Sequence, residues 1–111
     1  MCGIVGFLSF QSSKDKLCNR EKLLNALNSI EHRGPDKLSG VIGKNFFFGS
    51  ARLAIEAINY GNQPFFSKDK RFVLIFNGEI FNYKNLIKKF FKERKIISEG
   101  DLLLNLFLKF D

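Results

Sequence analysis

The sequence is poor in the residues that several common kinds of site require. Its single histidine, His32, leads us to expect neither a histidine-based catalytic triad nor a multi-histidine metal site. Its two cysteines, Cys2 and Cys18, do not make the disulfide framework of a small secreted domain. No apolar run reaches about 18 residues, and the first residues lack the basic segment and long apolar stretch of a signal peptide. We therefore expect a cytoplasmic protein with reduced thiols and no membrane association.

Acidic residues are scarce relative to basic ones, which leaves a net charge of +7. Such a charge can indicate a surface for nucleic acid. Much of it, however, comes from residues 84–95, where lysine and arginine alternate with apolar side chains. That pattern is typical of the solvated face of an amphipathic helix, so we expect no nucleic-acid partner.

The remaining composition favours one globular domain, because 45% of the 111 residues are hydrophobic and 14 are phenylalanine. Residues 71–76 carry the strongest signal for a central strand. Asn19 is a plausible N-cap, and Ser98 with Asp101 resembles a capping box. Apolar spacing and turn residues predict helices at 20–30, 84–93 and 102–110, and strands at 4–10, 41–42, 46–48, 71–76 and 96–97.

Cys2 occupies a position at which one residue can supply both a nucleophile and a base. Removal of Met1 would leave a thiol and a free α-amine on the same carbon. The α-amine of model peptides has a pKa of about 7.7–8.0, so it can accept a proton near neutral pH. The residue could thus attack a carbonyl and take up its own thiol proton. The alternative is an accidental cysteine at the start of a buried strand.

Three further segments allow both a structural and a chemical interpretation. Residues 31–36 (EHRGPD) form either a polar connector or a loop that presents polar groups at a fixed angle. Arg52, in an otherwise small or apolar run, is either a surface residue or a partly buried clamp for a carboxylate. Asn77 and Gly78 form either a hairpin turn or a two-donor oxyanion hole, and Glu79 beside them could take a substrate ammonium.

Five segments occur in a fixed order along the chain: residues 1–6 (MCGIVG), 32–36 (HRGPD), 52–55 (RLAI), 63–64 (QP) and 77–82 (NGEIFN). Together they resemble the class II glutamine amidotransferase family, which is of the N-terminal-nucleophile hydrolase type. The string HRGPD looks most like the asparagine synthetase branch of that family. The resemblance covers nearly the whole chain.

The resemblance implies an enzyme that hydrolyses L-glutamine to glutamate and ammonia, with no metal or other cofactor for this step. It makes Cys2 the nucleophile and its freed amine the base. It assigns the α-carboxylate of glutamine to Arg52 and the oxyanion hole to Asn77 and Gly78. Arg33 would order the site around Cys2.

The chain departs from the family pattern in two segments. Family members carry Ser-Asp-Thr-Glu, or a near variant, where this chain has residues 98–101 (SEGD). Register by the following apolar run places Glu99 at the aspartate that binds the amine of glutamine, whereas a shifted register would use Asp101. We favour Glu99, with Glu79 assisting at the same end of the substrate. Residues 52–57 (RLAIEA) also lack a hydroxyl and a carboxylate of the family pattern.

The resemblance also sets an expectation for architecture. It implies an α+β fold, a four-layer αββα sandwich of which residues 1–111 would be about the first half, a partial type 2 glutamine amidotransferase domain truncated before its C-terminal half. The synthetase domain, which uses ATP and Mg²⁺, would be absent, supplied as a further domain or by a second chain. The alternative is a non-catalytic truncated fragment that needs a partner chain to fold, because half a sandwich exposes an apolar sheet face.

Overall fold

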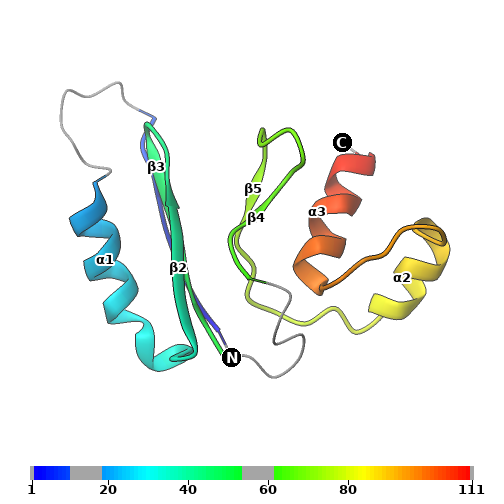
Figure 1. Cartoon of the computed structure of the whole chain (residues 1–111), viewed down its shortest axis with the longest axis horizontal. Coiled ribbons are helices and arrows are strands. Elements are labelled where there is room, and N and C mark those ends of the chain that lie inside the picture. The colour runs from blue at the N-terminus through cyan, green and yellow to red at the C-terminus, as the bar shows by residue number, and fades with distance from the viewer. Residues whose placement is uncertain (1, 11–18, 54–61, 111) are drawn as a thin grey trace.

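The structure is a computed structural model that describes residues 2–10, 19–53 and 62–110. Its elements in chain order are β1 (Gly3–Leu8), α1 (Arg20–Ser29), the 3-10 turn η1 (Glu31–Arg33), β2 (Lys37–Ile42), β3 (Phe46–Arg52), β4 (Phe65–Phe66), β5 (Val73–Leu74), α2 (Tyr83–Phe90) and α3 (Glu99–Phe110). Figure 1 shows α1 on one side of the sheet that contains β2 and β3, with β4 and β5 on the other side and α3 and α2 beyond them. The chain is therefore α+β, with two antiparallel sheets lying between helices.

β3 is the central strand of the three-stranded sheet, whose order is β1-β3-β2. Both neighbours pair with it in antiparallel fashion, Gly3 opposite Ala51 on one side and Lys37 opposite Arg52 on the other. The predicted turn between β2 and β3 is confirmed, since the amide of Gly43 donates to the carbonyl of Phe46 over 2.8 Å. The strands are longer than predicted because the small residues that follow Phe48 continue the pairing as far as Arg52.

The core of this layer lies between the sheet and α1. Val5 and Phe7, which alternate along β1, pack against Leu23 and Leu27 of α1 and Phe47 of β3. Burying Leu23, Leu27 and Phe47 contributes about 1.5–3 kcal/mol for each side chain. The alternate residues of β1 face away from α1, and two of them, Ile4 and Leu8, are exposed.

α1 begins and ends where its local sequence predicts. The side chain of Asn19 accepts a hydrogen bond from the amide of Lys22 over 2.8 Å, which confirms the predicted N-cap. The helix ends at Ser29, and the adjoining residue Ile30 donates its amide to the carbonyl of Leu27 over 3.1 Å. α1 therefore runs without a break into the turn that carries Arg33.

The second sheet corrects one sequence prediction. Residues 71–76 were expected to form a central strand, but within the described residues only Val73–Leu74 is a strand, and it pairs with β4 alone. The flanking residues are held mostly by side chains, and the carbonyl of Phe72 also accepts from the backbone amide of Ser67 over 3.0 Å. The Ser67 hydroxyl accepts from the amide of Phe72 over 3.0 Å, and the Gln63 carboxamide binds both backbone groups of Phe76.

α2 and α3 form the outermost layer. The predicted helix at 84–93 is shorter, ending at Phe90, whose ring meets that of Phe110 edge-on at 5.1 Å. The lysines of α2 are exposed, as expected for its solvated face. Within the described ranges, none of the helices has the length and apolar character needed to cross a bilayer.

Residues 96–97 are not a strand, which corrects a second prediction. The amide of Ile97 donates to the carboxylate of Asp101 over 3.1 Å instead of to a neighbouring strand. The Ser98 hydroxyl accepts from the amide of Asp101 over 3.2 Å, as the capping box predicts. α3 consequently begins three residues earlier than expected, at Glu99.

Candidate functional site

The thiol of Cys2 lies at the C-terminal end of β3. Because Gly3 pairs with Ala51, the residue before Gly3 reaches the last residues of the central strand. The Cys2 thiol donates to the carbonyl oxygen of Leu53, with a sulfur–oxygen distance of 3.7 Å. Cys2 is half-buried, so its sulfur is held against β3 without being closed off from solvent.

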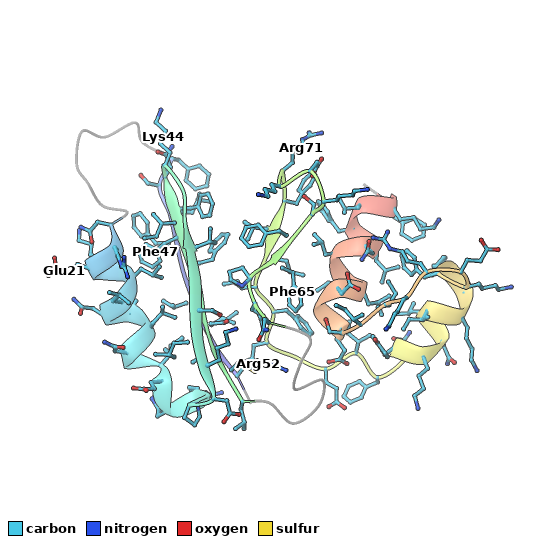
Figure 2. The ribbon with its side chains drawn as sticks, in the orientation of Figure 1. Glu21, Lys44, Phe47, Arg52, Phe65 and Arg71 are labelled. Atoms are coloured by element: carbon cyan, nitrogen blue, oxygen red, sulfur yellow. The ribbon has the colours of Figure 1, made fainter. Side chains whose placement is uncertain are left out.

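Arg52 is buried at the same end of β3, with only 8% of its surface exposed. The interpretation of Arg52 as a surface residue is therefore wrong. Strand alternation places its side chain on the face opposite Phe47 and α1, and in Figure 2 it lies on the side of the sheet toward β4. Its guanidinium donates to the side-chain oxygen of Asn62 over 3.1 Å. A buried guanidinium with its planar fork suits a carboxylate ligand.

The turn at 31–36 packs against both strands of the site. A side chain at Gly34 would overlap the carbonyl oxygen of Ala51, so only glycine allows this approach to β3. Arg33 lies directly beside β1, since a Cβ added to Gly3 would come within 3.0 Å of the Cβ of Arg33. The amide of Asp36 donates to the carbonyl of Arg52 over 3.1 Å. These contacts favour the interpretation of the turn as a loop held at a fixed angle.

Asn77, Gly78 and Glu79 form an exposed segment after β5. Because the next regular element is α2, the hairpin interpretation of Asn77 and Gly78 is wrong. The segment is held at both ends: Gln63 binds Phe76 before it, and the amide of Ile80 after it donates to Glu99 over 2.7 Å.

Hydrogen bonds connect this segment to the Arg52 end of β3. Phe76 is bonded to Gln63, and the preceding residue Asn62 is bonded to Arg52. Among the bonds found in the described residues, none joins Cys2 directly to residues 77–79. The structure thus places Cys2, Arg33 and Arg52 around the end of β3 at which β1 begins. It links Arg52 to Asn77 through three intervening residues, Asn62, Gln63 and Phe76.

The two candidate carboxylates of α3 point to different partners. Asp101 accepts from the side chain of Asn105 over 2.8 Å and from the amide of Ile97. Its carboxylate therefore stabilises the N-terminal end of α3. Glu99 instead reaches Ile80, the residue after Glu79. Of the two, Glu99 is the one bonded to the residue that directly follows the predicted donor segment.

Tyr83 of α2 lies close to the same carboxylates. Burial raises the pKa of its phenol, and the negative charges of Asp101 and Glu99 raise that pKa further. The phenol therefore remains neutral at physiological pH. Within the described part of the chain, no group of three or more His, Cys, Asp or Glu side chains is placed to hold a metal ion.

Sequence reasoning placed residues 63–64 in the family pattern but assigned no role to the polar residues that join the two sheets. The Ser39 hydroxyl of β2 donates to the carbonyl of Gln63 and lies 3.2 Å from the hydroxyl of Ser50 in β3. All of these groups lie between the sheets, where Ser50 and Gln63 are buried. The signal available in the sequence was weak, because single serines on short strands and a glutamine before proline occur in many turns.

A family model described as the glutamine amidotransferase domain matches residues 1–110 of the chain. This match extends from the segment with Cys2 through the last residues of α3. The chain therefore belongs to the glutamine amidotransferase family, in its class II, asparagine synthetase-type branch.

Several similar proteins are glutamine-hydrolysing asparagine synthetases. A probable asparagine synthetase of Acanthamoeba polyphaga mimivirus is 38% identical over 96% of this chain and 20% of its own length. The asparagine synthetase of Brassica oleracea is 37% identical over 91% of this chain and 17% of its own. Asparagine synthetase 2 of Bacillus subtilis (strain 168) is 35% identical over 78% of this chain and 12% of its own. The chain thus spans a fifth or less of the length of these relatives.

Proposed function

We propose that this chain carries the site that hydrolyses L-glutamine to glutamate and ammonia, with Cys2 as the nucleophile. The observation that supports it most is the position of the thiol beside the residue that follows Arg52, at one end of β3. A glutamine whose α-carboxylate binds the Arg52 guanidinium would extend its side-chain amide toward the Cys2 sulfur. The matching family is described as a glutamine amidotransferase domain, and the names of the relatives specify glutamine hydrolysis.

The reaction needs only groups that this chain contains, together with water. The Cys2 sulfur attacks the amide carbon of glutamine, and the thiol proton passes to the α-amine freed by removal of Met1. The tetrahedral intermediate collapses, the carbon–nitrogen bond breaks, and that proton leaves with nitrogen as ammonia. Water then hydrolyses the thioester, which releases glutamate and restores the thiol.

Asn77 and Gly78 are the proposed donors to the oxyanion, through a side-chain amide and a backbone N–H. Removing one such donor costs about 10²–10³ in kcat in other hydrolases. Glu79 and Glu99 are the proposed partners of the substrate amine, which is supported by the bond from Ile80 to Glu99. Arg33 is proposed to order the start of β1, and Asp101 to support the N-terminus of α3.

We also propose that residues 1–111 are the first half of a four-layer N-terminal-nucleophile hydrolase sandwich. The order of layers in Figure 1, from α1 through the two sheets to α3, supports this proposal. The accessible surface of 8127 Å² also exceeds the value for a compact monomer of 12.8 kDa, which is about 6,300 Å². The remaining half would cover the open sheet faces.

The names of the relatives suggest the use of the ammonia. We propose that it is delivered to a synthetase domain or a second chain that uses ATP and Mg²⁺ to make asparagine, in the cytoplasm. The alternative of a non-catalytic fragment is not favoured by any of these relatives.

The proposed nucleophile is tested by mass spectrometry and mutation. We expect the purified chain to lack Met1 and to be alkylated at Cys2 by a diazoketone analogue of glutamine, because the freed amine and thiol form the reactive pair. Cys2→Ala should abolish glutaminase activity, whereas Cys18→Ala should retain it. Retention of Met1, an absence of alkylation, or equal losses in the two variants would contradict the proposal.

A further inference from the structure

The carboxamide of Gln63 binds the backbone of Phe76 through two short hydrogen bonds. Its nitrogen donates to the Phe76 carbonyl over 2.6 Å, and its oxygen accepts from the Phe76 amide over 2.6 Å. The residue is buried, with 9% of its surface exposed. One side chain thus satisfies the donor and the acceptor that a neighbouring strand would otherwise pair.

Gln63 is itself anchored to the three-stranded sheet. Its backbone carbonyl accepts from the hydroxyl of Ser39 in β2, and the residue before it, Asn62, is bonded to the guanidinium of Arg52. On its other side, the residue after Phe76 is Asn77. Gln63 therefore connects the sheet that carries Cys2 to the start of the segment with the proposed oxyanion donors.

We propose that Gln63 is a positioning residue, which sets the place of Asn77 and Gly78 relative to Cys2 through its two bonds to Phe76. This inference rests on the proposed function. Oxyanion donors act only within a narrow range of distances from the reacting oxygen. A displacement of 1 Å can lower the rate by about 100-fold. Loss of the Gln63 carboxamide leaves both backbone groups of Phe76 without their partners, which frees the segment to shift.

The carboxamide is required because Phe76 presents one donor and one acceptor. In Gln63→Glu, an acceptor oxygen replaces the donating nitrogen and faces the carbonyl of Phe76. Gln63→Met has a similar length and can form neither bond. Both substitutions leave the side chains of Cys2 and Arg52 unchanged.

Ser67 offers a matched control at the other end of β5. Its hydroxyl accepts from the amide of Phe72 over 3.0 Å, and 5% of its surface is exposed, so it is as buried as Gln63. Ser67→Ala therefore loosens the same strand without a contact to the 77–79 segment. If the role of Gln63 were purely structural, substitutions at Gln63 and at Ser67 would lower kcat in proportion to their loss of melting temperature.

The test compares the full chain with its Gln63→Glu, Gln63→Met and Ser67→Ala variants. Steady-state glutamine hydrolysis gives kcat and KM, and the diazoketone analogue gives the rate of Cys2 alkylation. We expect the Gln63 variants to lose about 10- to 100-fold in kcat and in alkylation rate, with KM changed less than about threefold because Arg52 is untouched. Ser67→Ala should lower the melting temperature and keep the wild-type kcat.

Each outcome decides between the positioning role and the alternatives. A wild-type kcat in both Gln63 variants would overturn the positioning role alone. So would a loss of kcat that follows the loss of melting temperature in all three variants, Ser67→Ala included. A wild-type chain that neither hydrolyses glutamine nor reacts with the analogue would overturn the proposed function and the positioning role with it.

A further variant keeps the test decisive where circular dichroism finds the Gln63 variants unfolded. Ser39→Ala removes the bond to the Gln63 carbonyl and leaves both bonds to Phe76 in place. We expect kcat to fall by several-fold with KM retained. A wild-type kcat in Ser39→Ala would overturn the anchoring of the donor segment through Gln63.

Discussion

At the scale of single residues, burial distinguishes Arg52 from the other arginines. Arg52 lies between the sheets and donates to Asn62, whereas Arg33 is exposed beside β1 and Arg71 is exposed on the turn before β5. A guanidinium held away from water forms stronger bonds to a carboxylate than an exposed one does. This difference makes Arg52 the arginine best suited to bind the α-carboxylate of a substrate.

Arg52→Ala should raise the KM for glutamine by about 10- to 100-fold, which corresponds to the loss of charged hydrogen bonds worth about 1.5–3 kcal/mol. The KM of Arg52→Lys should fall between those of the wild type and Arg52→Ala, because an ammonium keeps the charge but lacks the planar fork. Arg71→Ala is the matched control, since the Arg71 guanidinium lies over the neighbouring Phe72 ring, 5.6 Å from its centroid, and its other described interaction is with the charge of Asp69 on the same turn. Steady-state kinetics with an unaltered KM in Arg52→Ala would remove Arg52 from the site.

At the scale of elements, α2 and α3 are joined by aromatic packing and by a phenol next to two carboxylates. The raised pKa of Tyr83 means that the folded chain holds the phenol proton more tightly than the unfolded chain does. The corresponding stabilisation is complete below the ordinary tyrosine pKa of 10.0 and is lost as pH rises through the raised value. The contact between the two helices should therefore weaken in alkali.

Tyr83→Phe should reduce the loss of stability in alkali, because the substitution removes the ionising phenol and keeps the ring. The measurement is the midpoint of urea unfolding at pH 8 and at pH 11. Lysine titration is common to all variants, and Tyr60→Phe, at the other tyrosine of the chain, controls for the loss of a phenol as such. An equal alkaline shift in the Tyr83 variant and the wild type would show that α2 and α3 do not sense this group.

At the scale of the whole molecule, the two sheets leave apolar surface open between them. Leu8 of β1 is 52% exposed and Phe66 of β4 is 50% exposed, and both lie on the faces turned away from the helices that cover their sheets. Single exposed apolar side chains are common, whereas several that gather on one surface are typical of a binding surface. We predict that Leu8 and Phe66 belong to such a surface. We therefore expect another protein segment to pack on this apolar surface.

Leu8→Thr should lower the binding of an apolar fluorescent dye, because Leu8 belongs to this open face. Leu24→Thr is the control: Leu24 is exposed to a similar extent, 45%, and lies on α1 outside the space between the sheets. Dye fluorescence should fall more in the Leu8 variant than in the Leu24 variant. Equal reductions would show that the space between the sheets is not a preferred apolar surface.

The sequence by itself determined the parts of this protein that depend on neighbours a few residues away. The N-cap at Asn19, the spacing that makes α1, and the cap at Ser98 are set within one helical turn. The order of the motifs, from Cys2 to residues 77–82, was enough to recognise the family that the comparison then matched. The amino-acid sequence is enough to predict these features, because each depends on residues that are close together or in a fixed order along the chain.

Only the tertiary structure decided which partners distant residues find. The hydrogen bond of Arg52 depends on Asn62, the short β5 depends on Gln63 and Ser67, and the contact of Glu99 depends on Ile80. In each case a side chain satisfies a group far from it along the chain, or one on another element. Apolar periodicity does not encode such pairings, because they arise only when the sheets and helices have packed together.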